Sequence, residues 1–341
     1  DQWRERMKIE CPKNILKNSP ISLSNTSQIR KPILKKITLP RINKIGSRLA
    51  LGCDNQISDL HAFTMFDHFY ESGGRIFDTA YIYNHGKGDK YLGDWINSRG
   101  VAKDVVVIGK AAHTPECEPK FIRPQILESL DRLNIPKIDI FCLHRDNRDV
   151  PVDEFVDALS DIQNEGLIDL LGASNWELDR FSSARANAKK NKKEPFSALS
   201  NNFSLAEMMQ PVWPGCVGVN ENFLEYIINE KILLFPWSSQ ARGFFIKKKE
   251  QISNEHFSNP TLDEEMRVWH YEKNLRRREK CFELAEKKSV EPIQIALAYV
   301  LHQSDLIFPL IGPRTISETN SSIDATKIKL SVKELEELSQ D

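Results

Sequence analysis

The sequence predicts an α/β protein with the architecture of a (β/α)8 TIM barrel. From about residue 35 onward, short apolar runs alternate with amphipathic stretches, a pattern typical of parallel strands joined by helices. Eight such units in about 300 residues match this barrel. A doubly wound dinucleotide-binding fold would need Gly-x-Gly-x-x-Gly after its first strand, and Gly86-Lys87-Gly88 lacks the third glycine and the preceding strand.

The predicted strands are short runs of apolar and β-branched residues. The third run, residues 105–110, begins with three valines and an isoleucine, as expected for a strand that is buried on both faces. In chain order the strands are expected at residues 48–52, 75–78, 105–110, 138–144, 167–173, 196–200, 232–236 and 306–311.

The predicted helices carry apolar residues three or four positions apart. Leu127, Leu130 and Leu133 share one helical face, and the helix at 152–165 stops before Gly166. A long polar connection precedes the charged helix at 267–287, so the seventh unit is elongated. In chain order the helices are expected at residues 58–71, 90–98, 124–133, 152–165, 177–190, 222–230, 267–287, 292–301, 317–325 and 332–339.

Composition excludes several classes of protein. The formal net charge of −1 argues against general binding to nucleic acid. The longest mainly apolar stretch, residues 293–301, is far shorter than the roughly 20 residues of a membrane span. The 6 cysteines are far apart and form no Cys-x-x-Cys pair, which favours free thiols in a reducing, cytoplasmic location.

The first 33 residues differ from the rest of the chain. They are rich in Lys, Asn and Ser, contain three prolines and show no sustained apolar period. We expect residues 1–33 to be an extension or linker, in part disordered, and residues 34–341 to form the barrel. The charged run at residues 1–6 has no apolar core of the kind found in a secretory signal.

Four polar residues follow consecutive predicted strands. Asp78 ends the second strand with Tyr83 five positions later, Lys110 ends the third, and His144 ends the fourth. Because the carboxyl ends of barrel strands meet at one rim, these side chains are expected to converge there.

This set of residues suits the reduction of a carbonyl group. Hydride addition builds negative charge on the carbonyl oxygen, so a proton donor such as Tyr83 must stand beside it. Lys110 would lower the pKa of the phenol, and Asp78 would keep the lysine charged. His144 can hydrogen-bond to the substrate oxygen, although His113 could compete for that role.

The chain resembles the aldo-keto reductase family in this tetrad, in the segments 166–168 and 172–176, and in the turn Gly312-Pro313-Arg314-Thr315. The resemblance runs from about residue 36 to the end. It implies a barrel enzyme that uses NADP(H) to reduce a small-molecule aldehyde or ketone to an alcohol. It further implies that Tyr83 is the general acid in reduction and the base in oxidation.

Cofactor contacts are expected at three places. The resemblance places the nicotinamide carboxamide on Ser174 and Asn175 and the ring on Trp237, and it places the adenine on Glu318. The run at 238–243 can present backbone donors and hydroxyls to the pyrophosphate, and the turn at 312–315 opens a helix where an anion is favoured. A guanidinium at Arg314 favours NADP over NAD. The residues expected in these two segments are Ser238, Gln240, Arg242, Gly243, Gly312, Arg314 and Thr315.

Two departures from the family pattern concern the cofactor. The glutamine expected after the sixth strand is absent, and Ser200, Asn201 and Asn202 stand in that neighbourhood without a choice among them. Ser322 stands where the family has an adenine-contacting asparagine.

The substrate is less defined than the chemistry. Residues 247–271 are the candidate cover of the site, and Trp213, Trp269, His270 and Tyr271 would suit a sugar-derived carbonyl by stacking and hydrogen bonding.

Two other classes of protein are alternatives to a reductase. The first is an NADPH-binding redox-sensing or interaction module, with residues 1–33 as a partner-binding arm. The second is a metal-dependent hydrolase, which would need converging His and carboxylate ligands, whereas His61 and His68 share one helix face. We therefore expect no metal.

Overall fold

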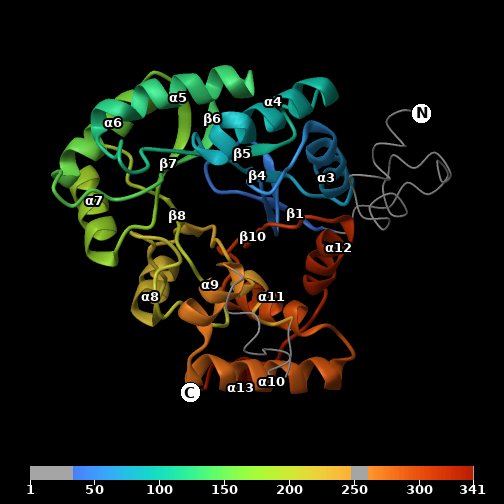
Figure 1. The fold of residues 1–341 in the computed structure, drawn as a ribbon. Coiled ribbons are helices and arrows are strands. Elements are labelled where there is room, and N and C mark those ends of the chain that lie inside the picture. Colours follow the sequence, from blue (N-terminus) through green and yellow to red (C-terminus); the bar gives the residue numbers. More distant parts are fainter. Residues whose placement is uncertain (1–33, 247–259, 341) are drawn as a thin grey trace.

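Eight parallel strands form the wall of a barrel in the computed structural model, which describes residues 34–246 and 260–340 (Figure 1). They lie in the order β10-β3-β4-β5-β6-β7-β8-β9. The strands are β3 (Ala50–Gly52), β4 (Ile76–Asp78), β5 (Val106–Ala111), β6 (Ile138–Leu143), β7 (Ile168–Ser174), β8 (Ala198–Ser200), β9 (Leu233–Leu234) and β10 (Leu310–Ile311).

The two edges of this sheet meet at Leu234. Its backbone bridges in parallel to Ile307, just before β10, with hydrogen bonds of 2.9 Å to the Leu306 oxygen and 2.8 Å from the Phe308 nitrogen. The predicted (β/α)8 barrel is thereby confirmed.

Helices surround the strands (Figure 1). Each of the strands from β3 to β8 is followed along the chain by one of the helices α3 to α8, and α12 follows β10. Among the described residues between β9 and β10 lie the α-helices α9, α10 and α11, and α13 packs on α10. The helices are α3 (Asp59–Glu71), α4 (Lys87–Arg99), α5 (Pro119–Leu133), α6 (Val152–Asn164), α7 (Leu178–Lys190), α8 (Glu221–Asn229), α9 (Pro260–Trp269), α10 (Glu272–Lys288), α11 (Pro292–Gln303), α12 (Ile316–Ala325) and α13 (Val332–Ser339).

The prediction of one helix over 267–287 was wrong, because the chain breaks between α9 and α10. Tyr271 has an extended backbone. The buried side chain of Asn274 donates to the Trp269 carbonyl at 3.0 Å, which supplies a partner for the end of α9. The helix predicted at 124–133 begins earlier, at Pro119, so Pro124 lies inside α5.

A hairpin that the sequence did not predict packs against the barrel interior. Its strands are β1 (Lys36–Thr38) and β2 (Ile45–Ser47), and its apolar residues Leu39 and Ile42 pack with inward-facing residues of the barrel strands. Lys44 anchors it with an ion pair of 2.9 Å to the buried Asp139 and a hydrogen bond to the Val105 carbonyl. The hairpin therefore covers the amino-terminal end of the barrel.

Arg48 joins the first barrel strand to the last strand and helix unit. Its guanidinium donates to the carbonyls of Leu301, Ser304, Asp305 and Ile307 at 2.6 to 2.9 Å. These carbonyls belong to the end of α11 and to the segment that leads into β10, where helix carbonyls lack partners. One side chain thus satisfies several acceptors across the barrel closure.

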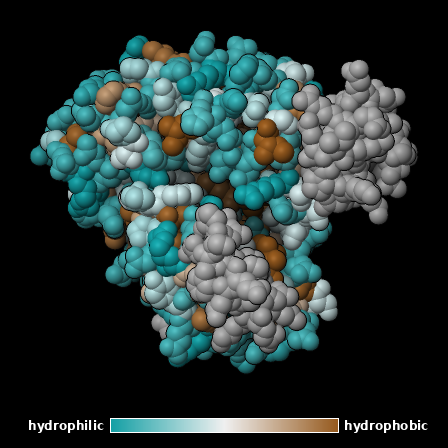
Figure 2. Space-filling model, viewed as in Figure 1, coloured by the Kyte–Doolittle hydropathy of each residue, from teal (hydrophilic) through white to brown (hydrophobic). Residues whose placement is uncertain are grey.

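Two predicted features lie outside the described residues, namely the extension at 1–33 and residues 247–259 of the candidate cover. None of the described helices is long and apolar enough to cross a bilayer. On the face shown in Figure 2, hydrophobic residues are scattered among hydrophilic ones.

Candidate active site

Asp78 and Lys110 form a buried ion pair at the ends of the adjacent strands β4 and β5. Lys110 Nζ lies 2.5 and 2.6 Å from the two carboxylate oxygens, and both side chains are 2% exposed. Burial would lower the pKa of Lys110, but Asp78 and Tyr83 together raise it above its usual value. Burial raises the pKa of Asp78 to about 6, although Lys110 opposes the shift. Near neutral pH both groups are therefore charged.

Tyr83 contacts this ion pair. Its hydroxyl lies 3.3 Å from Lys110 Nζ, and the same Nζ lies 5.0 Å from the centre of the phenol ring. The residue is half-buried but its hydroxyl is enclosed, and this burial raises the pKa of Tyr83 above 10 although Lys110 lowers it. The net direction is opposite to the one expected from the lysine alone. In this structure Tyr83 is therefore a neutral phenol that carries a proton to donate.

The turn that follows Tyr83 has an unusual backbone. Asn84, His85 and Gly86 all have positive φ angles of 49°, 55° and 85°. The Asn84 side chain donates to the carbonyls of Asp54 and Gln56 at 3.2 and 3.4 Å. Sequence reasoning missed Asn84, although Asn-His-Gly is a combination that tolerates left-handed conformations.

His144 lies at the end of β6, next to Tyr83. The two ring centres are 5.7 Å apart and meet edge to face. Burial, followed by the charges of Lys110 and Arg145 and the nearby His113, holds the pKa of His144 well below its usual range. His144 is thus neutral near pH 7. His113 contacts it edge to face at 4.8 Å and is half-buried, so both candidate histidines lie at this site.

The residues expected to hold the nicotinamide follow β7 and β8. Ser174 Oγ donates to the Ser200 carbonyl at 2.6 Å. The Asn175 amide donates to the His144 carbonyl at 3.3 Å and to Ser174 Oγ at 3.0 Å, and it accepts from the Val217 nitrogen at 3.2 Å. Ser174 and Asn175 are therefore hydrogen-bonded to one another, to His144 and to Ser200.

Hydrogen bonding distinguishes Ser200, the last residue of β8, from Asn201 and Asn202, which follow it. Asn201 accepts from the backbone of Asn175 and donates to the Trp176 carbonyl, and Asn202 donates to the Trp237 carbonyl at 3.0 Å. Ser200 Oγ is buried and has no hydrogen-bond partner within the described part of the chain. Ser200 therefore retains hydrogen-bonding capacity for a ligand.

Trp237 is half-buried beside the exposed Trp213, with ring centres 6.4 Å apart. Arg242, expected at the pyrophosphate, lies 5.1 Å above the Trp213 ring and forms an ion pair of 2.7 Å with Glu264 of α9. Within the same run, Ser238 and Gly243 have positive φ angles, and Gln240 donates to the Ile293 carbonyl at 3.3 Å.

The turn between β10 and α12 exposes Gly312 and Arg314. Thr315 caps α12 by accepting from the Glu318 nitrogen at 3.2 Å. A Glu318 carboxylate oxygen accepts from the Arg314 nitrogen at 2.6 Å. In this structure the carboxylate of Glu318 is therefore the anion at the start of α12, where an anion is favoured. Ser322 lies further along α12 and is buried.

The profile of the aldo/keto reductase family matches residues 45–340. The chain belongs to the aldo/keto reductase family. One relative is a norsolorinic acid reductase of Aspergillus flavus, 27% identical over 301 residues, which cover 84% of this chain and 71% of the relative. Another is a probable aryl-alcohol dehydrogenase of Saccharomyces cerevisiae, 25% identical over 296 residues, which cover 81% of this chain and 86% of the relative.

A solved glycerol dehydrogenase from Gluconobacter oxydans shares the fold. It superposes with a TM-score of 0.68 at 20% sequence identity and covers 89% of this chain and 93% of its own. The relatives named above are a reductase and a dehydrogenase, which together with the family match supports an oxidoreductase.

Not all the aromatic residues expected at the substrate lie at a surface of this aldo/keto reductase. Trp269 is fully buried in the core. Its ring therefore has no exposed face on which a sugar could stack, contrary to the prediction. His270 and Tyr271 are partly buried between α9 and α10, whereas Trp213 is 46% exposed. Trp213 is therefore the best placed of the four to meet a substrate.

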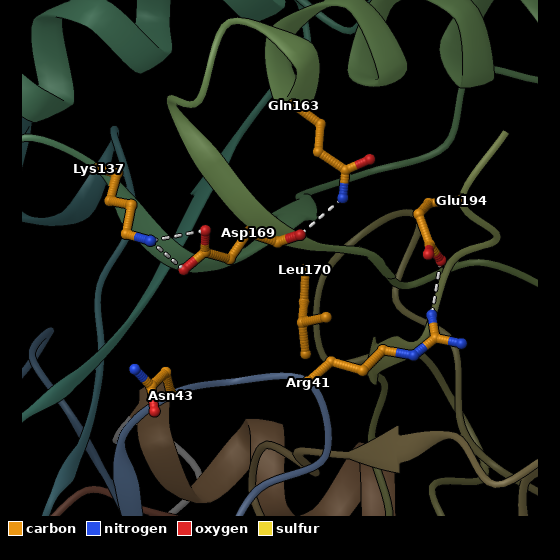
Figure 3. Close-up of a pocket in the computed structure, with 7 residues that line it drawn as sticks. All are labelled: Arg41, Asn43, Lys137, Gln163, Asp169, Leu170 and Glu194. Atoms are coloured by element: carbon orange, nitrogen blue, oxygen red, sulfur yellow. Dashed lines mark hydrogen bonds and ion pairs between the residues drawn. The ribbon is translucent and has the colours of Figure 1, made fainter.

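A separate pocket of about 440 Å³ lies near the start of β7, away from the strand ends that carry the tetrad (Figure 3). Lys137 pairs with Asp169 at 2.7 Å and Arg41 pairs with Glu194 at 2.6 Å. The four charged side chains of this pocket are thus engaged in ion pairs with one another.

Proposed function

We propose that this chain is an NADP(H)-dependent oxidoreductase that reduces an aldehyde or ketone to an alcohol, with Tyr83 as the proton donor. The observation that carries the proposal is the continuous contact from Asp78 through Lys110 to Tyr83, with His144 beside the phenol. These groups supply an acid and a fixed positive charge where a carbonyl oxygen would gain negative charge.

The described residues fit a nicotinamide dinucleotide. Ser200 Oγ is a buried hydroxyl without a protein partner, close to Ser174, and can bond to a carboxamide. Trp237 offers an indole ring on which a nicotinamide can stack. Arg314 is exposed at the start of α12 and can pair with a 2′-phosphate, which supports NADP(H) over NAD(H). When bound, the cofactor supplies the hydride.

The protein's own residues donate the proton and stabilise the negative charge that forms on Tyr83. Tyr83 gives its hydroxyl proton to the substrate oxygen and becomes a phenolate. The ammonium of Lys110, 3.3 Å away, stabilises that phenolate, and Asp78 keeps the ammonium charged in its buried position. Neutral His144 orients the substrate by a hydrogen bond to the same oxygen. In oxidation, the Tyr83 phenolate takes the proton back.

The substrate class is proposed from the exposed aromatic surface and from the named relatives. Exposed Trp213 can stack on a planar ring, and the relatives include an aryl-alcohol dehydrogenase and a norsolorinic acid reductase. Aromatic aldehydes and ketones are therefore the first substrates to test, with sugar-derived carbonyls as the second group. We also propose a cytoplasmic location, which the five free, buried thiols within the described residues support.

The experiment follows NADPH oxidation by absorbance with a panel of aryl and sugar-derived carbonyls, and it measures NADPH and NADH binding by fluorescence. We expect Tyr83→Phe to reduce kcat by about 10²- to 10⁴-fold while cofactor binding is kept. Tyr81→Phe is the matched control, because Tyr81 Oη donates instead to the exposed Glu128 at 2.9 Å. Full turnover by Tyr83→Phe would contradict the proton-donor role, and binding without turnover by wild type would favour a sensing module.

A further inference from the structure

The loop between β3 and α3, residues 53–58, touches both the proton-donor turn and the turn between β10 and α12. On one side, Asn84, which follows Tyr83, donates to the carbonyls of Asp54 and Gln56. On the other side, Asn55 Nδ2 donates to the Gly312 carbonyl at 2.7 Å. One short loop is thus hydrogen-bonded to two segments that lie more than 200 residues apart in the chain.

His61, in the first turn of α3, strengthens the second contact. Its Nδ1 accepts from the Ile57 nitrogen at 3.4 Å, which leaves Nε2 as the ring nitrogen that can donate. Nε2 donates to the Arg314 carbonyl at 2.8 Å, and the residue is 3% exposed. Asn55 and His61 therefore hold two carbonyls of the turn that carries the predicted phosphate-binding residues Arg314 and Thr315.

We propose that Asn55 and His61 are positioning residues that hold the 312–315 turn in the shape that receives the cofactor phosphate, and that Asn84 links this turn to Tyr83. The inference rests on the proposed function. Because the loop is shared, any change that loosens it at one end alters the other end. We therefore expect a substitution of Asn84, beside Tyr83, also to weaken cofactor affinity through the shared loop.

The first arm of the test compares two histidines of the same helix. His68 lies seven residues after His61, is 2% exposed and also contacts α12, through a 2.8 Å hydrogen bond to Asn320. We expect His61→Leu to raise the Kd for NADPH about tenfold, as the loss of one well-formed hydrogen bond predicts. His68→Leu should lower thermal stability to a similar extent and change that Kd less than about twofold.

The second arm uses Asn84→Gly, because glycine keeps the positive φ and removes only the side chain. We expect a lower kcat and also a Kd for NADPH raised about threefold, although Asn84 does not touch the 312–315 turn. Hydrogen exchange of the cofactor-free protein gives a readout without ligand. The amides of Gly312 and of residues 314–316 should exchange faster in His61→Leu, Asn55→Ala and Asn84→Gly than in wild type or His68→Leu.

The outcomes separate the two proposals. Equal exchange and equal Kd in His61→Leu and His68→Leu would overturn the positioning role. Unchanged exchange at 312–316 and unchanged Kd in Asn84→Gly would overturn the link to Tyr83. Wild-type protein that binds neither NADPH nor NADH would overturn the proposed function, while the exchange data would still decide whether the loop holds the turn.

Discussion

Replacing Asp78 with asparagine tests whether this carboxylate keeps Lys110 charged inside the barrel. Asparagine has nearly the same size as aspartate, so the substitution removes a charge without opening a cavity. Lys110 is 2% exposed and would lose the partner that now lies 2.5 Å away. In wild type the lowering effect of burial on the pKa of Lys110 is outweighed by Asp78 and Tyr83. Without the Asp78 charge, burial is opposed far less strongly, so we expect the pKa of Lys110 to fall.

The expected loss of stability is large. Removing one member of a buried ion pair costs about 3–5 kcal/mol, because the remaining charge is left without compensation. An exposed ion pair would cost about 0–1 kcal/mol. Because both side chains are 2% exposed, the Asp78–Lys110 pair is a buried ion pair and the larger cost applies. We also expect kcat to fall by about 10²-fold or more, since a neutral amine stabilises the Tyr83 phenolate poorly.

The assay is urea unfolding of wild type, Asp78→Asn, Lys110→Met and the double variant, combined with kcat at saturating cofactor. The double variant should be more stable than Asp78→Asn, because it no longer buries an unpaired charge. A loss below about 1 kcal/mol in Asp78→Asn, or a double variant no more stable than it, would refute the reasoning.

Three further predictions concern pH and the cofactor. Since the pKa of Asp78 is raised to about 6, kcat should fall as the pH drops below about 6, and Asp78→Asn should lack this acid limb. His144 stays neutral in the folded protein, while the unfolded chain takes up a proton below about pH 6.5; the free energy of unfolding should therefore decrease as the pH falls below about 6.5, and urea unfolding should show a shallower pH dependence in His144→Asn. Arg314→Met should raise the Kd for NADPH about 10- to 100-fold and leave that for NADH nearly unchanged, because only the former carries the 2′-phosphate; an equal effect on both cofactors would count against this role.

The convergence of the candidate side chains was predictable because these polar residues lie at strand ends. Asp78, Lys110 and His144 each end a run of buried apolar residues, and the barrel itself brings such positions together. The direction of the Tyr83 pKa was not predictable in the same way. It depends on how far the hydroxyl is enclosed, and that is set by loops whose packing leaves no periodic pattern in the sequence.

Other features depend on tertiary contacts that no local pattern records. The hairpin of β1 and β2 has three-residue strands, too short for an alternation to be visible. The break between α9 and α10 contains neither proline nor glycine and is stabilised by Asn274. The sequence also could not show that the Asn201 and Asn202 side chains are hydrogen-bonded within the protein whereas Ser200 Oγ is not, because this depends on their tertiary partners.

The contacts of Arg48 have a consequence for how the chain acquires its structure. Its four carbonyl acceptors lie 253 to 259 residues further along the sequence. On a ribosome, β3 must therefore wait until residues 301–311 have been synthesised before its open edge is paired. An unpaired edge strand invites association with other chains, and contacts between distant segments form slowly. Nascent chains that stall before α11 are thus expected to aggregate or to need a chaperone, whereas release of residues 301–311 allows the barrel to close.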